Sequence, residues 1–270
     1  MRIFAATLRK LVRRPASFVT LGLLTGLLAL ILIAVSATAG QRSGRAAQEA
    51  LLLVTFPGAY TLILSFILGL GGLFAVIYGA AIAGSEWNWG TLKAAIARGE
   101  SRSRYQLLSF AGIALMIGVG LLVAFGVGVA VAVVGANLAR VSTAGLGDSK
   151  AIGSLPELLG RGWVAIVEEG ALGFAIATLA RSQLAGIGAG IAVYFGEQFA
   201  SIFLPDIVKY LPFNAATAAV ATSGSSSFGG GGGVVVARLE PNDALIVVVL
   251  WLVGALVVAT LFTERAEISG

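Results

Sequence analysis

The sequence has no cysteine and no histidine, the side chains from which many reactive sites are built. A chain without them has no thiol nucleophile, no disulfide, and no thiolate or imidazole ligand for a metal or a haem. We therefore expect no catalytic residues, no bound metal and no cofactor in this chain.

Charged residues are also scarce. They make up 11% of the 270 residues, whereas a soluble domain carries about 25%. Hydrophobic residues make up 58%, and the mean hydropathy is +0.96. So few charges cannot cover a surface that faces water, so we expect the lipid bilayer to be the solvent. Backbone polar groups in lipid need partners within their own segment, so the fold class predicted is an all-α integral membrane protein.

Long apolar runs predict six transmembrane helices, because about 20 residues at 1.5 Å each cross the hydrocarbon core. The first run is longer than the apolar core of a signal peptide, so we expect it to be retained. The predicted spans are Ser17–Ala39, Gly58–Ala83, Gln106–Val134, Arg161–Ala180, Leu184–Leu204 and Asp243–Phe262.

Lysine and arginine predict the orientation. With the N-terminus inside, eleven of them fall on the cytoplasmic side and seven outside, and the bias is strongest around the first two inside segments. Both termini are then cytoplasmic. Because the positive residues cluster next to the spans, we attribute the net charge of +5 to orientation signals, and we expect membrane lipid but no nucleic acid as a partner.

The N-terminal segment 1–16 is predicted to be separate from the six-span domain 17–270. Phe4, Leu8 and Leu11 recur at helical spacing, and Arg9 and Arg13 lie among the basic residues of the other face. The pattern predicts an amphipathic helix on the inner membrane surface, ended by proline. The alternative is a positive-inside anchor with no further role.

Three connections between spans are long. The cytoplasmic loop covers residues 84–105, and the external segments cover 135–160 and 205–242. In the last segment, Ile207–Val220 is too short to span and predicts a re-entrant or interfacial helix, and the glycines at 229–233 predict a flexible tip. Spans four and five are joined by only Arg181–Gln183, which predicts a tight helical hairpin.

The cytoplasmic loop contains a short helix candidate, Thr91–Arg98, with Gly99 in the position of a C-terminal cap. Leu92, Ala95 and Ile96 share one face, and an amphipathic helix facing the cytoplasm is suited to dock a soluble partner. We expect Glu86 to pair with Arg98, Arg102 or Arg104 and so to pin the loop. The alternative is a solvated positive loop.

Three segments occur in an order that is known from one family. Leu8–Ser17 is basic and ends at a proline, residues 86–105 contain Glu86, Gly90-Thr91-Leu92-Lys93, Arg98 and Arg104-Tyr105, and Leu179–Gln183 precedes a glycine-rich run. In this order they resemble the elbow helix, the loop after span two and the link between spans four and five of type-2 ABC exporter permeases. The resemblance covers essentially the whole chain. One departure is that Gln106 and Ser109 stand where the family often has lysine.

The resemblance implies a bacterial plasma-membrane permease that works with two separate ABC ATPase subunits. ATP and Mg²⁺ would bind to those subunits, because no Walker A sequence occurs in this chain. The implied substrate is a drug, a peptide antibiotic or a lipid-like amphipath. The residues that the resemblance places at the ATPase-docking surface are Glu86, Gly90, Thr91, Leu92, Lys93, Arg98 and Arg104.

Two pairs of glycines have the small-xxx-small spacing that lets helices approach closely in lipid. Gly22 and Gly26 lie in span one, and Gly186 and Gly190 lie in span five. The resemblance places these spans at the interface with a second permease copy or a homologue. Packing within one subunit is the alternative.

Three acids fall inside predicted spans, where a charge costs roughly 2.5–3.5 kcal/mol and usually faces a cavity or a partner. Glu169 and Glu197 are candidates for the translocation pathway. For Glu168 we favour a shallow position near the outer interface, with Arg161 seven residues earlier on the same face.

Two other classes compete with a transporter. One is a membrane-embedded immunity or assembly factor that acts by binding alone. The other is a membrane enzyme, which would have to use only carboxylates, and these follow no known catalytic spacing: Asp148, Glu157, Glu168, Glu169, Glu197 and Asp206.

Overall fold

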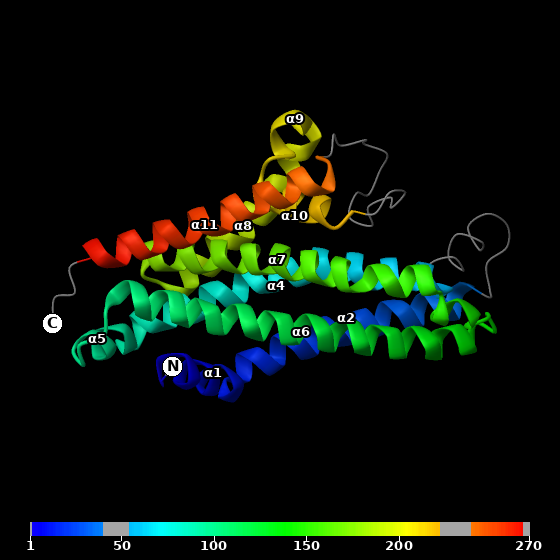
Figure 1. The fold of residues 1–270 in the computed structure, drawn as a ribbon, viewed down its shortest axis with the longest axis horizontal. Helices are drawn as coiled ribbons and strands as arrows, with labels where there is room; N and C mark the ends of the chain where they lie inside the picture. Colours follow the sequence, from blue (N-terminus) through cyan, green and yellow to red (C-terminus); the bar gives the residue numbers. More distant parts are fainter. Residues whose placement is uncertain (1, 40–53, 222–238, 267–270) are drawn as a thin grey trace.

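The computed structural model describes residues 2–39, 54–221 and 239–266, and within these ranges the chain forms helices and turns but no β-strand. Figure 1 shows long helices that run side by side along one axis, with α1 and α5 at one end of the bundle. The predicted flexible tip at 229–233 lies outside the described residues.

Among the described residues, five helices are long and apolar enough to cross a membrane, as the predicted all-α membrane fold requires. At about 1.5 Å per residue, even the 25-residue helices exceed a hydrocarbon core of about 30 Å. These five are α2 (Pro15–Ala39), α4 (Gly58–Asn88), α6 (Arg102–Leu138), α7 (Ser149–Ala180) and α11 (Pro241–Arg265).

The predicted fifth span is α8 (Gln183–Phe203), which is 21 residues long. It is not among the five candidate spans, because Glu197, Gln198 and several glycines dilute its apolar residues. Its length suits a crossing, so the sixth span stays a prediction. The turn at Arg181–Ser182 before α8 is as tight as expected.

Helices α4, α6 and α7 all extend beyond the predicted spans. The largest difference is at α7, which begins at Ser149 rather than Arg161 and includes Pro156. Asp148 caps this helix by accepting from the Lys150 amide at 3.2 Å. Most of the predicted external loop 135–160 is therefore helical, because the backbone hydrogen bonds of α6 and α7 continue beyond the apolar residues of each span. Between α6 and α7 the structure has one short 3₁₀ helix, Ala144–Gly147.

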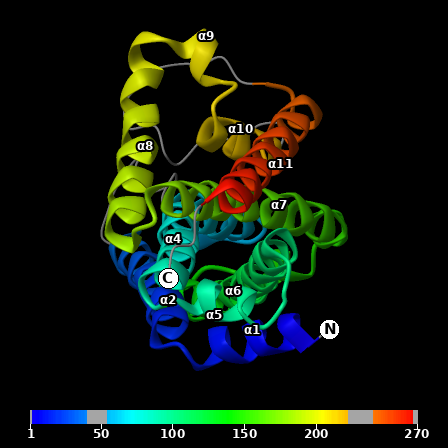
Figure 2. The ribbon, with the colours of Figure 1, turned by 90° about the vertical axis from the view of Figure 1, so that its left-hand side faces the viewer.

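The expected short helix at Ile207–Val220 is present as two pieces. They are α9 (Pro205–Val208) and α10 (Pro212–Ala219), and each begins with a proline in its first turn. In Figure 2, α10 lies between α8 and α11, above α7. Phe213, Ala215 and Ala219 of α10 are buried, so this helix is part of the packed bundle.

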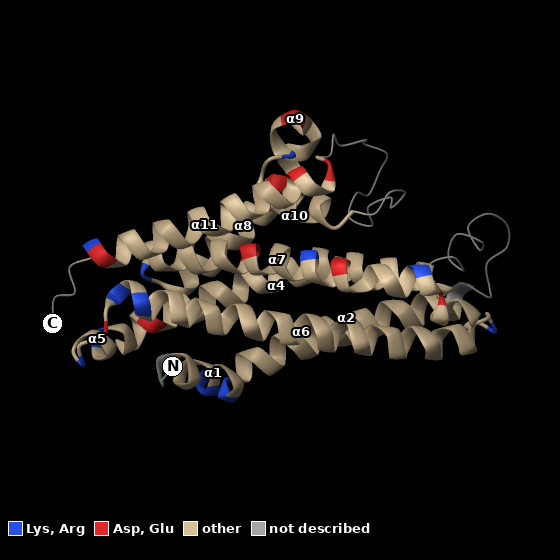
Figure 3. Cartoon of the chain, in the orientation of Figure 1, with Lys and Arg blue, Asp and Glu red and all other residues tan. Residues whose placement is uncertain are grey.

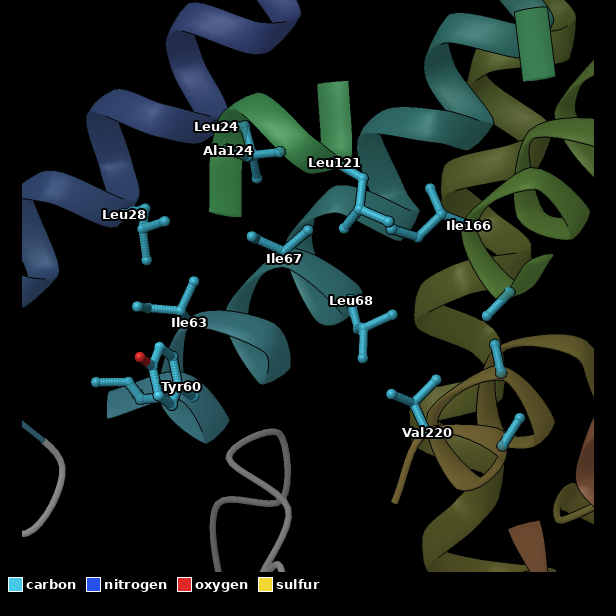
Figure 4. Packing of buried hydrophobic residues seen from close by; sticks show 14 of the residues in the cluster. Leu24, Leu28, Tyr60, Ile63, Ile67, Leu68, Leu121, Ala124, Ile166 and Val220 are labelled. Carbon is cyan, nitrogen blue, oxygen red and sulfur yellow. The ribbon is translucent and has the colours of Figure 1, made fainter. Parts of the chain in front are cut away.

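The core is built around α4. Figure 4 shows Ile63, Ile67 and Leu68 of α4 meeting residues of α2, α6 and α7. On the α7 side the two backbones approach closely. A Cβ on Gly79 would lie 2.1 Å from the Gly170 carbonyl oxygen, and a Cβ on Gly173 would lie 2.0 Å from the Val76 oxygen. Glycine at these positions therefore sets the distance between α4 and α7.

Large apolar side chains cover much of the outer surface. Examples are Leu184 at 83% exposed and Phe203 at 78%, both on α8. Side chains of this kind would form an aggregating surface in water, but they are the expected outer face of a helix in lipid. Figure 3 shows that the middle parts of α2, α4, α6 and α11 carry no charge, and that lysine and arginine gather around α1 and α5.

Candidate functional site

The polar contacts of the bundle concentrate where α1 (Arg2–Arg13), the end of α4, α5 (Thr91–Ile96) and the start of α6 meet. We call this region the α1–α5 end. At its centre is Glu86, which is only 3% exposed. Its carboxylate accepts hydrogen bonds from Lys10, from the hydroxyl of Thr91, and from the hydroxyl of Tyr105 at 2.5 Å.

Glu86 therefore ties three other elements to the end of α4. Lys10 belongs to α1, Thr91 to α5 and Tyr105 to α6, so one carboxylate fixes the position of each relative to the others. A buried carboxylate that loses such donors is left with an uncompensated charge. The arrangement can transmit a displacement of α5 to the helices of the bundle.

The expected pairing of Glu86 with an arginine of its own loop is wrong. Arg98 instead donates to the Ala94 carbonyl at 3.0 Å, and Arg102 turns toward α11. The prediction considered only partners close in sequence, whereas α1 packs against α6 and thereby brings Lys10 to the carboxylate at the end of α4. No spacing in the sequence signals a contact across 76 residues.

Arg14 fixes the bend between α1 and α2. One guanidinium nitrogen donates to the Ser85 hydroxyl at 2.8 Å, and the group lies 4.8 Å from the ring centre of Trp89. Ser17 donates to the Leu11 carbonyl across the same bend and is 2.9 Å from the Tyr78 hydroxyl. The expected break at Pro15 is therefore held by side chains of α4.

The loop helix α5 begins at Thr91 as the sequence predicts and ends at Ile96, two residues before the predicted end at Arg98. Gly90 precedes it with φ 65°, a left-handed conformation that favours glycine. Gly99 follows with φ 87°, its amide donates to Ile96 at 2.9 Å, and the Glu100 amide donates to Ala95 at 3.3 Å. These two bonds form a Schellman motif, which confirms Gly99 as the C-terminal cap.

The predicted docking residues divide into two groups. Glu86 and Leu92 are buried, so they position the loop and do not contact a partner themselves. Lys93, Arg98 and Arg104 are exposed, while Gly90 and Thr91 are half-buried. Trp89 is also exposed, at 66%. The surface that α5 presents is therefore basic, with one aromatic residue beside it.

Sequence reasoning missed the contact between α6 and the end of α11. One guanidinium nitrogen of Arg102 lies 3.2, 2.9 and 2.8 Å from the carbonyl oxygens of Thr263, Glu264 and Ala266. Gln106 donates to the Thr263 hydroxyl at 3.0 Å. These contacts satisfy carbonyls that the end of a helix leaves without partners. Arg181 stacks nearby on Trp87 and Phe262, each at 5.2 Å.

Replacing Arg102 with alanine is expected to loosen the last turn of α11. The lost charge-assisted hydrogen bonds predict amide hydrogen exchange in residues 259–266 that is faster by about tenfold. Exchange measured by mass spectrometry in nanodiscs would show the change, and Arg102→Lys is expected to restore part of the protection. Equal exchange in the wild type and Arg102→Ala would contradict a capping role for this side chain.

The two glycine pairs lie in different surroundings. A Cβ on Gly22 or Gly26 would meet no atom of the described residues within 4 Å. A Cβ on Gly186 would lie 2.4 Å from the Ala177 side chain, and one on Gly190 would lie 2.4 Å from Val76. The second pair therefore packs against helices of its own chain, and the interface with a second copy stays a prediction.

Arg161 does not reach toward Glu168, contrary to expectation. It forms an ion pair with Glu157 at 2.8 Å and donates to Asn242, also at 2.8 Å. It points toward the beginning of α7, where Ala219 at the end of α10 and Asn242 of α11 supply acceptors.

The three acids expected inside spans, Glu168 and Glu169 of α7 and Glu197 of α8, are all buried. Glu168 is 0% exposed and Glu169 is 3% exposed. The Glu169 carboxylate lies against Gly72, where a Cβ would be 2.0 Å from Oε2. Gly72 is near the middle of α4, so this pair lies deep in the bundle and away from both ends. Glu197 is bound to the start of α10, where it accepts from the amides of Phe213 at 3.2 Å and Asn214 at 2.6 Å.

Comparison with known protein families found none that matches this chain, and no curated protein matches it either. Among residues 2–39, 54–221 and 239–266, no three carboxylates lie close enough to hold a metal ion. The function of the chain is therefore inferred from its own geometry, mainly from the α1–α5 end and the buried acids.

Proposed function

We propose that the chain is the membrane-spanning permease subunit of an ABC exporter in a bacterial plasma membrane. In this proposal it has six spans and cytoplasmic termini, and it pairs with a second permease copy and two ATPase subunits that bind ATP and Mg²⁺. The observation that carries the proposal is the α1–α5 end, where an exposed basic helix is joined through one buried carboxylate to α1, α4 and α6.

The proposed coupling follows from those contacts. An ATPase subunit that pushes on Lys93 and Arg98 displaces α5, and the displacement passes through Thr91 to Glu86 and from there to α1 and α6. A flexible loop would absorb such a push, whereas α5 is capped at its end and buries Leu92 and Ala95. The displacement would then switch the close-packed bundle between two discrete arrangements of its helices.

An apolar pocket supports a hydrophobic or amphipathic substrate. It lies between α2, α4, α6 and α7, and nearly all of its lining is apolar, with Ser17, Thr20 and Tyr78 as the polar members. Representative lining residues are Leu24, Ile67, Phe74, Met116 and Ile166. Its volume of about 110 Å³ suits one apolar group of a drug, a peptide antibiotic or a lipid-like molecule, not the whole molecule.

The proposal is tested by co-purification with the ABC ATPase encoded nearest to the gene, followed by an ATPase assay in nanodiscs. We expect wild-type protein to retain the ATPase and Lys93→Glu/Arg98→Glu to lose it, because the double substitution reverses the charge of the exposed face of α5. Lys150→Glu is the control, since Lys150 is exposed at the outer start of α7. Failure of the wild type to retain any ATPase would favour an immunity or assembly factor instead.

A further inference from the structure

The pair Glu168 and Glu169 has no role in the contacts described so far. Both oxygens of Glu168 and Oε2 of Glu169 are buried and have no hydrogen-bond partner among the described residues. Glu197 differs, because the start of α10 satisfies its carboxylate, including the Asn214 side-chain amide at 2.8 Å. Glu197 therefore holds α10 in place, whereas Glu168 and Glu169 have no comparable role in the contacts of the described residues.

An unpartnered carboxylate in the middle of a membrane protein is expensive. Buried charges are normally paired, and acids within spans usually face a substrate or ion pathway. The nearest basic side chain on α7 is Arg161, which is already bound to Glu157 and Asn242. Glu168, Glu169 and Glu197 also lie within electrostatic range of one another, so the three carboxyl groups form one buried cluster.

The surroundings of the pair suit an organic cation better than a metal ion. Tyr194 lies within electrostatic range of Glu169 and Glu197, and its ring packs edge-on against Phe213 at 4.9 Å. Aromatic rings attract organic cations, whereas metal ions of the Ca²⁺ type need six to eight oxygen ligands. The described residues bring no such set of acids together.

The apolar pocket comes within about one helical turn of the acids along α4 and α7, although neither the Glu168 nor the Glu169 carboxylate lines it. Gly71 lines the pocket, and its neighbour Gly72 is the residue against which the Glu169 carboxylate rests. Ile166 also lines the pocket and is three residues before Glu169, hence on the same side of α7. A molecule with an apolar body in this pocket would have its charged end close to the carboxylates.

We propose that Glu168 and Glu169 bind the positive charge of the transported molecule, which is an amphipathic organic cation with its apolar part in the adjoining pocket. The inference rests on the proposed function, because it names the substrate class of that exporter. Glu168 and Glu169 are the binding residues. Glu197 is a positioning residue, because it holds the start of α10, where Phe213 packs against Tyr194.

The test uses the purified full-length protein in nanodiscs and radiolabelled tetraphenylphosphonium as the cation, with empty nanodiscs as background. We expect saturable binding to the wild type and affinity at least about tenfold weaker for Glu168→Gln/Glu169→Gln, since a charged partner is lost. Glu157→Gln is the control, because that side chain is 67% exposed near the outer part of α7. Triphenylphosphine oxide, a neutral molecule of similar shape, is expected to show no difference between the proteins.

Equal tetraphenylphosphonium affinity in the wild type and the double variant would overturn the proposal, as would displacement of the probe by sodium but not by choline. The double variant should fold, because glutamine keeps the shape of a side chain whose oxygens lack protein partners, and a monodisperse elution profile checks this. Binding needs no ATPase. If the wild type retains the ATPase but does not bind the cation, this inference alone is overturned. If the wild type binds the cation but retains no ATPase, the exporter proposal alone is overturned.

Discussion

Gly173→Ala is expected to prevent correct packing of the bundle. A Cβ at this position would lie 2.0 Å from the Val76 oxygen, 2.8 Å from the Val76 carbonyl carbon and 2.9 Å from its Cα. All three are backbone atoms of α4, so no side-chain rotation relieves the overlap. Overpacking of this kind costs about 1–3 kcal/mol or more. The measurement is the yield of monodisperse protein in mild detergent, together with its thermal stability.

Gly160→Ala is the matched control for that substitution, because it makes the same change in the same helix. A Cβ on Gly160 meets no atom of the described residues within 4 Å. Alanine there should be neutral or stabilising by up to about 1 kcal/mol, since glycine is the poorer helix former. If Gly173→Ala and Gly160→Ala behaved alike, α4 and α7 would not be packed as closely as the structure shows.

Glu86→Ala is expected to uncouple α5 from the bundle. The substitution removes the acceptor of Lys10, Thr91 and Tyr105 at once. We expect a loss of about 2 kcal/mol, below the range for fully buried pairs because the Lys10 side chain is 30% exposed. Under the proposed function, ATP hydrolysis by the retained ATPase would no longer respond to the permease. The readouts are thermal stability and ATPase activity of the co-purified complex.

The control for Glu86→Ala is Glu157→Ala, which removes an acid that is 67% exposed. That change is expected to shift stability by less than about 1 kcal/mol, as for most surface ion pairs. Glu86→Gln separates charge from shape, because it keeps an acceptor for the two hydroxyls but not the ion pair with Lys10. Unchanged stability in Glu86→Ala would contradict the central position given to this carboxylate.

Local features of the sequence predicted local structure well. The glycine cap of α5, the break at Pro15 and the tight turn before α8 each follow from the conformational preference of one or two residues. The membrane class followed from long apolar runs, and five helices meet that expectation. Helix limits were less predictable, because α7 continues through Lys150, Pro156 and Glu157, where the apolar pattern is interrupted.

Contacts between distant segments could not be predicted. The ion-pair partner of Glu86 is Lys10 of α1, and the acceptors of Arg102 are carbonyl groups at the end of α11. Neither contact has a sequence signature. The sequence has 37 glycines, and nothing in their spacing distinguishes the ones that set the α4–α7 distance. The depth of Glu168 and Glu169 was not predictable either, because α7 begins at Ser149, twelve residues before the predicted span.

The central claim, that α5 docks an ATPase, is tested most directly by site-specific crosslinking. The chain has no cysteine, so Ala97→Cys introduces a single thiol on the exposed side of the turn that ends α5. Ser142→Cys does the same at the opposite end of the bundle, after α6. In membranes that contain the co-expressed ATPase, the account predicts a thiol-specific crosslink to the ATPase from Ala97→Cys and none from Ser142→Cys. No crosslink from Ala97→Cys, or equal crosslinking from both positions, would contradict it.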